Sequence, residues 1–206
     1  MKKKMINERE CFSPYLIIVL LALLLSGCAS GVKNMRVVPP EQAVVAPESG
    51  QSMVVFMRPS AFGVAIESSI FEIKGDTPSL IGTLVAQQKL AYQLEPGKHL
   101  FMVAGNNADY LSAELRPNKT YYVRIAPIMG KWIGRFEIAP IPINMLYSAR
   151  FKGRLKECEE VEKIAAPAGE EESEMAAIQS KHKEYYAKWA NEDRSKKPKL
   201  LPRDGK

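Results

Sequence analysis

Residues 52–140 carry their hydrophobic positions in patterns that β-strands produce. Met53–Met57 is apolar throughout, which is typical of a central strand covered on both faces. Two further short strands, at residues 69–74 and 80–84, are separated by Gly75 and Asp76, and we expect them to pair as neighbours. The region therefore begins with three short strands and no helix.

Strict alternation of apolar and polar residues follows, with turn residues about every ten positions. One strand ends at Leu94, and Glu95–Lys98 fits a type II turn, because proline presets φ at its second position and glycine accepts positive φ at its third. His99 begins the return strand, so the pattern predicts a β-hairpin. Residues 116–119 separate two more alternating strands, up to Ile125, in the same way. About seven or eight short strands predict a mainly β protein, a small antiparallel β-sandwich or barrel over residues 52–142.

The pattern changes after Pro140 and Pro142. Residues 143–194 are charged and helix-prone, and Pro167–Gly169 breaks this segment in two. We expect a C-terminal helical extension here, followed by an unstructured basic tail over residues 195–206.

The second predicted helix carries one apolar stripe. Its members recur at the 3-4-3-4 spacing of a helix face: Met175, Ile178, His182, Tyr185 and Trp189. The stripe either folds back to cover the chain's own core or docks on another protein. In the second case Met175, Ile178, Tyr185 and Trp189 are the partner-binding residues.

The N-terminus has a different hydrophobic pattern. A lysine-rich start is followed by an apolar run of 11 residues, Tyr15–Leu25, then by Ser26, Gly27 and Cys28. This is the order of an export signal. The run is shorter than the roughly 20 residues that a transmembrane helix needs.

Leu25–Cys28 (LSGC) resembles the lipobox of bacterial lipoproteins. The resemblance implies that residues 1–27 are a signal peptide, that Cys28 carries diacylglycerol and an acylated amino group, and that residues 28–51 are a lipidated start and flexible tether. Two or more acyl chains hold a protein firmly in a membrane, so the membrane is the first expected partner. Ala29 and Ser30 replace the Asp that retains such proteins at the inner membrane, which implies the outer membrane, facing the periplasm.

Net charge and cysteine content argue against nucleic-acid binding and against an internal disulfide. The 29 Lys and Arg against 23 Asp and Glu give +6, and without residues 1–27 the charge is +4, which is too mild to predict nucleic-acid binding. Cys11 lies in the signal and Cys28 takes lipid, so only Cys158 remains and no internal disulfide is expected. Cys158 is either a lone buried or tail thiol or a bridge to another chain.

Motifs for catalysis are lacking in the sequence. The two histidines, His99 and His182, have no zinc-site spacing, and there is no G-x-S-x-G, phosphate-binding loop or H-E-x-x-H. We therefore predict no catalytic residue, no cofactor and no metal. Two alternatives stay open: a hydrolase with an unrecognised carboxylate pair, and a glycan or small-ligand site at the Gly105–Asp109 loop, which is otherwise a connecting turn.

Three short motifs resemble the DUF2846-type bacterial lipoproteins: Val54–Arg58 before Pro59, Leu94–His99, and Lys119–Val123. PEGA-like surface β-domains share the P-G-x-H turn. The resemblance spans roughly Met53–Pro140 and implies a small β-sandwich of unassigned function on a lipid anchor, with no catalytic residue. The sequence thus predicts a non-enzymatic outer-membrane lipoprotein that binds another envelope protein or the cell wall through its sandwich or its helices.

Overall fold

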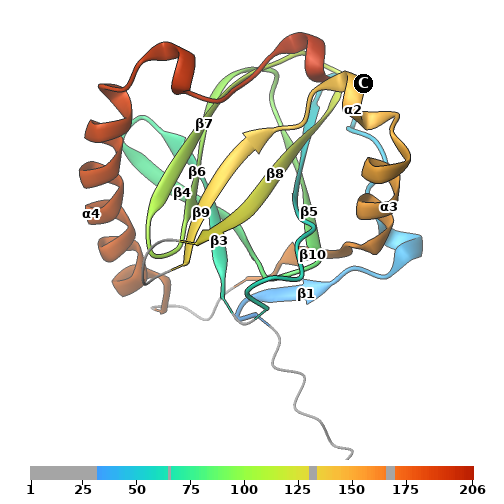
Figure 1. Cartoon of the computed structure of the whole chain (residues 1–206). Helices are drawn as coiled ribbons and strands as arrows, with labels where there is room; N and C mark the ends of the chain where they lie inside the picture. The colour runs from blue at the N-terminus through green and yellow to red at the C-terminus, as the bar shows by residue number, and fades with distance from the viewer. Residues whose placement is uncertain (1–31, 65, 130–133, 166–169) are drawn as a thin grey trace, which may run out of the picture. The chain divides into compact units, whose positions relative to one another are not determined.

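The computed structural model describes residues 32–64, 66–129, 134–165 and 170–206 (Figure 1). The predicted signal peptide, residues 1–27, and the predicted lipidation site, Cys28, lie outside the described residues.

Two β-sheets form the body of the described part of the chain. The first has the strand order β1 (Met35–Val37), β10 (Glu159–Lys163), β5 (Gln88–Leu94), β2 (Ser52–Arg58), β8 (Thr120–Met129), β9 (Gly134–Pro140). The second has the order β11 (Lys199–Leu200), β7 (Ala108–Leu115), β6 (Gly97–Ala104), β3 (Ser68–Lys74), β4 (Thr77–Leu84). The helices are α2 (Ile143–Leu146), α3 (Ala149–Glu157) and α4 (Glu170–Ala190), with 3-10 turns η1 (Pro40–Gln42), η2 (Arg194–Lys196) and η3 (Pro202–Asp204). The predicted mainly β sandwich with a C-terminal helical extension is confirmed.

The sheets are mixed, whereas the alternation pattern led us to expect antiparallel pairing throughout. β2 runs parallel to β8, β10 runs parallel to β5, and β11 runs parallel to β7. A parallel pair needs a long connection, and five strands lie between β2 and β8 along the chain. Pairing over such a distance leaves no local pattern in the sequence.

The predicted hairpin at Glu95–Lys98 is wrong in its partners. β5 pairs with β2 and β10, whereas β6 pairs with β3 and β7, so the turn carries the chain from one sheet to the other. Gly97 has a φ of +142°, which explains the glycine there. The turn at residues 116–119 likewise connects β7 of one sheet to β8 of the other. The predicted pairing of residues 69–74 with 80–84 is confirmed by the β3–β4 hairpin.

β2 is the central strand that its composition predicts. It lies between β5 and β8, and all seven of its residues are buried. Val54 and Phe56 face the interior between the sheets, while Met53 and Met57 belong to a second cluster on the outer face. Each fully buried side chain of this kind stabilises the fold by about 1.5–3 kcal/mol.

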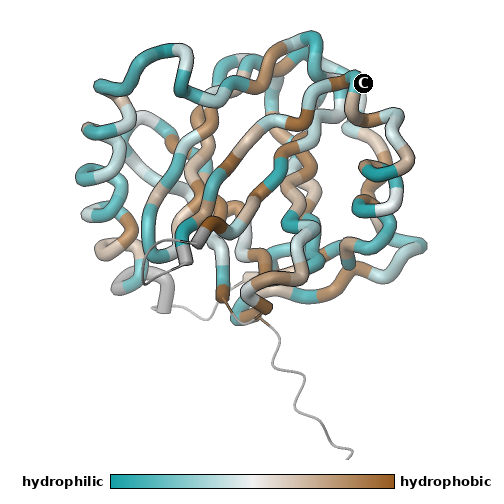
Figure 2. Tube along the Cα trace, viewed as in Figure 1, coloured by the Kyte–Doolittle hydropathy of each residue, from teal (hydrophilic) through white to brown (hydrophobic). Residues whose placement is uncertain are grey.

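Helices cover the outer face of each sheet, so the order of layers is helix, sheet, sheet, helix (Figure 1). Leu146 of α2 and Phe151 of α3 pack on the outer side of β2 and β8. Residues of α4 pack on the outer side of β3, β6 and β7. Figure 2 shows the hydrophobic positions gathered mainly along the strands, with α4 largely hydrophilic on its outside.

Arg58, at the end of β2, is a charged residue inside this core. Its side chain is fully buried and donates to the backbone carbonyls of Ile66, Leu84, Phe62 and Gly63. The guanidinium carbon also lies 4.9 Å from the centre of the Phe136 ring. These contacts hold the loop between β2 and β3, so the arginine that ends the opening strand has a structural role.

Two predicted boundaries are wrong. Within the predicted tether, Met35–Val37 forms β1 and pairs with β10, and the Val38 amide donates to the Glu160 carbonyl at 2.8 Å. Residues 159–163, predicted to be helical, form β10, which pairs with β1 and β5. Val161 is the one buried residue of this strand, at 2% exposed. Both strands are short and are fixed by backbone pairing, β1 at the edge of the sheet and β10 between β1 and β5, so they need little hydrophobic pattern.

The predicted unstructured tail is ordered. Leu200 in β11 is fully buried between the sheets, and Lys206 exchanges two backbone hydrogen bonds with Thr120, at 3.0 and 3.1 Å. Gly205 lies so close to the Tyr121 ring that a Cβ would be 2.7 Å from its Cζ. Leu200 and close backbone contacts hold this segment in place. Its basic, proline-containing composition gave no indication of this order.

Candidate functional site

The apolar stripe of α4 packs on the chain itself. Met175, Ile178, Tyr185 and Trp189 are partly buried against the outer cluster of the second sheet, beside Tyr110. Of the two alternatives left open by the sequence, the structure shows the one in which the helix covers the sandwich. Contacts within the chain bury part of each of these four predicted partner-binding residues.

His182, the fifth member of the stripe, is 2% exposed beneath α4. The Tyr110 hydroxyl donates to the His182 carbonyl at 3.2 Å and lies 3.1 Å from Nδ1 of the ring. Burial lowers the pKa of His182, and the more distant Asp76 raises it by less. Burial likewise raises the pKa of Tyr110. The pair is a neutral, hydrogen-bonded part of the core.

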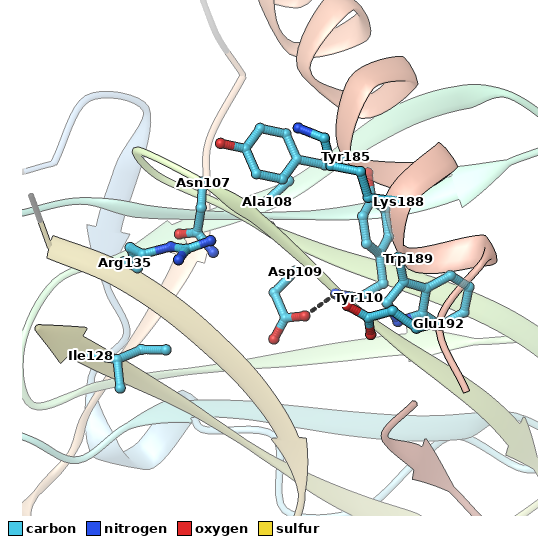
Figure 3. Close-up of a pocket in the computed structure, with 10 residues that line it drawn as sticks. All are labelled: Asn107, Ala108, Asp109, Tyr110, Ile128, Arg135, Tyr185, Lys188, Trp189 and Glu192. Carbon is cyan, nitrogen blue, oxygen red and sulfur yellow. Dashed lines mark hydrogen bonds between the residues drawn. The ribbon is translucent and has the colours of Figure 1, made fainter. Parts of the chain in front are cut away.

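A pocket of about 410 Å³ lies where the end of α4 meets β7, β8 and β9 (Figure 3). Its lining includes Asn107 and Asp109 from the loop that the sequence singled out for ligand binding, together with Tyr185 and Trp189. The remaining lining residues are Ala108, Tyr110, Ile128, Arg135, Lys188 and Glu192. This β7–α4 pocket is the first candidate for a binding site.

The polar groups of Asn107 and Asp109 are already used by the fold. Asn107 donates to the Phe136 carbonyl at 2.8 Å and accepts from the Phe136 amide at 2.7 Å. The Asp109 carboxylate accepts from the amides of Tyr110 and Ile138, at 2.9 and 3.0 Å. Burial raises the pKa of Asp109 most, these two hydrogen bonds lower it, and Glu137 and Glu192 raise it further. The loop thus ties β7 to β9, as a connecting segment does.

A second hollow, which we call the arginine groove, has a different character. It measures about 510 Å³ and lies between α2, α3 and the outer face of the first sheet. Three arginines line it: Arg124 from β8, and Arg150 and Arg154 from α3. The rest of its lining is largely apolar: Met57, Pro59, Pro140, Ile141, Pro142, Met145, Ser148 and Phe151.

The charges of the groove are all positive, since no acidic side chain is among its lining residues. Arg150 and Arg154 are four residues apart on α3, a spacing at which like charges destabilise a helix by about 0.2–0.5 kcal/mol. Arg124 contacts Glu137 at 3.4 Å, but both side chains are nearly half exposed, so this pair contributes little. Ser148 caps α3 by accepting from the Phe151 amide, which places the positive end of the helix dipole at the same hollow.

A smaller hollow of about 280 Å³ adjoins the groove. It shares Pro59, Arg124 and Arg154 with the groove and adds Ser60 and the β8 residues 125–127. Arg124 and Arg154 therefore line both hollows, the arginine groove with its apolar floor and the smaller hollow beside it. These arginines were not among the predicted site residues, although Arg150 and Arg154, four positions apart in a basic segment, were a readable sign.

A hydrogen-bonded cluster around Glu72 is satisfied internally. The carboxylate contacts His99 Nδ1 at 2.8 Å, accepts from the Tyr92 hydroxyl at 2.9 Å and pairs with Lys74 at 3.3 Å. Burial acts to raise the pKa of Glu72, but the three partners outweigh it and the pKa is lowered. The second ring nitrogen of His99 is bonded to the Glu95 carbonyl at 2.9 Å. Both ring nitrogens of His99 are therefore engaged within the fold.

Cys158 is a buried thiol, as one of the sequence alternatives held. It is 3% exposed, and burial raises its pKa to about 11, with a smaller opposing effect of Lys89. A thiol that stays protonated at neutral pH is a poor nucleophile.

Among the described residues, no group of three or more His, Cys, Asp and Glu side chains is arranged to hold a metal ion. In the same part of the chain, no helix has the length and hydrophobicity needed to span a bilayer.

Comparison with known proteins adds no relative. The chain matches no protein-family model, and no curated protein matches it. The resemblance to the DUF2846-type lipoproteins therefore stays a prediction.

Proposed function

We propose that the protein is a lipid-anchored, non-enzymatic component of the outer membrane that faces the periplasm and binds an anionic envelope component in the arginine groove. The anchor is Cys28, and the residues that follow it, up to β1, connect it to the folded unit. The observation that carries the binding half of the proposal is the groove itself. Three arginines line it and no carboxylate does.

The groove is favoured over the β7–α4 pocket by its free charge. The β7–α4 pocket mixes Asp109 and Glu192 with Arg135 and Lys188, and Lys188 already pairs with Glu184 at 2.7 Å. In the groove, by contrast, two arginines of one helix face the same hollow without a carboxylate among the lining residues. An anionic ligand relieves the repulsion between Arg150 and Arg154, whereas a neutral ligand leaves it in place.

The anchor is tested by blocking lipoprotein processing in cells. Globomycin, which inhibits cleavage of lipoprotein signals, should make the precursor accumulate, and Cys28→Ala should release the protein from the membrane fraction. Unchanged processing in globomycin would remove the lipid anchor from the proposal.

The groove is tested by crosslinking in intact cells, followed by mass spectrometry. We expect an envelope component to be captured by the full chain and to be lost with the double variant Arg150→Gln, Arg154→Gln. The matched control is Lys152→Gln, Lys156→Gln, which removes the same charge from the same helix at exposed positions outside the groove. Equal capture by both double variants would remove the groove from the proposal. Truncating the chain before α4 would not serve as a test, because α4 and β11 belong to the fold.

A glycan in the β7–α4 pocket is the second candidate, and one observation favours it. Trp189 lines the pocket and its indole N–H is buried without a hydrogen-bond acceptor. A sugar hydroxyl would supply that acceptor while its ring stacked on Tyr185. Trp189→Phe retains the ring but removes the N–H, so a melting shift caused by cell-wall sugars should disappear in this variant. No shift with the parent protein would reject the candidate.

A further inference from the structure

We propose that the ligand of the arginine groove is a phosphorylated amphiphile, with its phosphate between Arg124 and Arg154 and its hydrocarbon on the apolar floor around Met145 and Phe151. The inference rests on the proposed function and names the ligand class of the same site. Such a ligand would contact both the arginines and the apolar floor of the groove, which a simple anion would not.

The phosphate end is assigned from the position of two guanidinium groups. Arg124 projects from β8 and Arg154 from α3, and both line the groove as well as the smaller hollow beside it. An arginine fork binds phosphate oxygens in pairs, and two forks from separate elements surround a phosphate better than one. Within the part of the chain that the structure describes, no carboxylate forms an ion pair with Arg154, and Arg124 has a half-exposed pair with Glu137 at 3.4 Å. The charge of Arg154 is therefore available to a ligand, and a phosphate competes with Glu137 for Arg124.

The hydrocarbon end is assigned from the floor. Met57 and Phe151 are almost fully buried at its base, while Met145 is 57% exposed at the surface. Three prolines and Ile141 complete an apolar lining that a small hydrated anion would leave wet. A hollow of about 510 Å³ is within the size range of small-molecule sites, so it fits one headgroup with part of a chain.

The arginines and the apolar floor line the same groove, and this distinguishes the proposed ligand from the other anions of an envelope. A carboxylate-bearing wall fragment would engage the arginines but has no hydrocarbon for the floor. A neutral lipid would cover the floor but leave Arg150 and Arg154 without an anion. Only a molecule with both parts uses the whole hollow.

The test is calorimetric titration of the chain that begins at Ala29, which contains the whole compact unit Val32–Lys206. Four probes separate the contributions: short-chain phosphatidic acid below its micellar concentration, short-chain phosphatidylcholine, inorganic phosphate and soluble peptidoglycan fragments. We expect phosphatidic acid to bind at least about tenfold more tightly than each of the others. Arg154→Gln should weaken this binding about tenfold, because a hydrogen bond between charged groups is lost.

Two variants make the test specific. Lys152→Gln lies on α3 outside the groove and should change the affinity by less than about twofold. Met145→Gln should weaken the binding of phosphatidic acid but leave that of inorganic phosphate unchanged, since Met145 lines the groove and not the smaller hollow that Arg124 and Arg154 also line. All three substituted residues are exposed or half-buried, and circular dichroism with a melting curve checks that each variant is folded.

The outcomes distinguish the two proposals. Equal affinity for inorganic phosphate and phosphatidic acid overturns the amphiphile and leaves a phosphate site. Peptidoglycan fragments that bind, and lose binding in Arg154→Gln, overturn the lipid ligand but support the proposed function. An equal loss in Lys152→Gln shows diffuse attraction and overturns the groove. Absence of binding by every anion overturns both proposals.

Discussion

The two outer faces of the sandwich are covered by helices in different ways. On the second sheet, α4 lays a stripe of large side chains over β7, and Tyr110, Tyr186 and Trp189 form a contiguous aromatic group with ring centres 5.5–5.7 Å apart. On the first sheet, the short α2 and α3 contribute mainly Leu146 and Phe151, and the arginine groove stays open beside them. A long helix with a complete stripe closes a face, whereas two short helices leave a hollow at their junction. We expect stability to be concentrated under α4 and binding beside α3.

The largest expected effect tests the closed face. Tyr110→Ala should lower the free energy of unfolding by about 3–5 kcal/mol, because the ring is fully buried and α4 cannot collapse into the space. Met145→Ala, on the open face, should change it by no more than about 0.5 kcal/mol. Urea unfolding followed by fluorescence measures both. Similar losses for the two variants would break the contrast between the faces.

Acid should weaken the closed face before the open one. His182 has a lowered pKa in the folded protein, so below its ordinary value of 6.5 the unfolded state takes up a proton that the folded state resists. Stability is complete above about pH 6.5, falls as the pH drops from there, and levels off below the folded pKa. The melting temperature should therefore decrease from about pH 7 to about pH 5, and less so in His182→Gln. A parallel pH profile for the variant would assign the decrease to other groups.

Glu72 acts in a lower window. Its pKa is lowered below the ordinary value of 4.5, so its stabilisation is present above that value and is lost as the pH falls through the folded pKa. The His182 test is therefore made above this range.

The open face should accept stabilising changes. Gly153 lies in the middle of α3, and a Cβ there would meet no atom within 4 Å. Gly153→Ala should raise the free energy of unfolding by about 0.5–1 kcal/mol, since alanine loses less backbone entropy in a helix. Thermal melting measures the change, and Gly205→Ala, which would clash with Tyr121, is the destabilising control. A loss of stability in Gly153→Ala would mean that α3 is more tightly packed than the structure indicates.

The smallest expected effect joins stability to function. Arg154→Gln removes the repulsion with Arg150 and should stabilise the protein by about 0.2–0.5 kcal/mol while it weakens anion binding. Such opposite signs are typical of a residue kept for binding at a cost in stability. The melting temperature of the ligand-free protein at low salt measures the first half. A decrease would show that Arg154 stabilises α3.

Sequence patterns predicted those elements whose hydrophobic content is local. Met53–Met57 gave the central strand because both of its faces are buried, and the stripe from Met175 to Trp189 gave α4 because its period is helical. The Glu95–Lys98 turn misled us about pairing, since alternation shows which side of a strand is buried and not which strand lies next to it.

The arginine groove could not be predicted from local sequence patterns, for a related reason. The arginine groove takes its residues from β2, β8, the end of β9, α2 and α3, and only the parallel pairing of β2 with β8 brings Met57 beside Arg124. The ordered C-terminus was missed because Leu200 is a single buried residue among basic ones. Contacts between distant segments leave too few local signs to be predicted from one sequence.

The parallel pairing of β2 with β8 also bears on how fast the chain can fold. β2 lies in the interior of its sheet, yet its neighbour β8 is synthesised only after β3 to β7. Topologies dominated by such distant pairs fold in about milliseconds to seconds, far more slowly than those built from local hairpins. For the export that we propose, a slow-closing sheet would keep the chain unfolded during the interval in which it must be translocated.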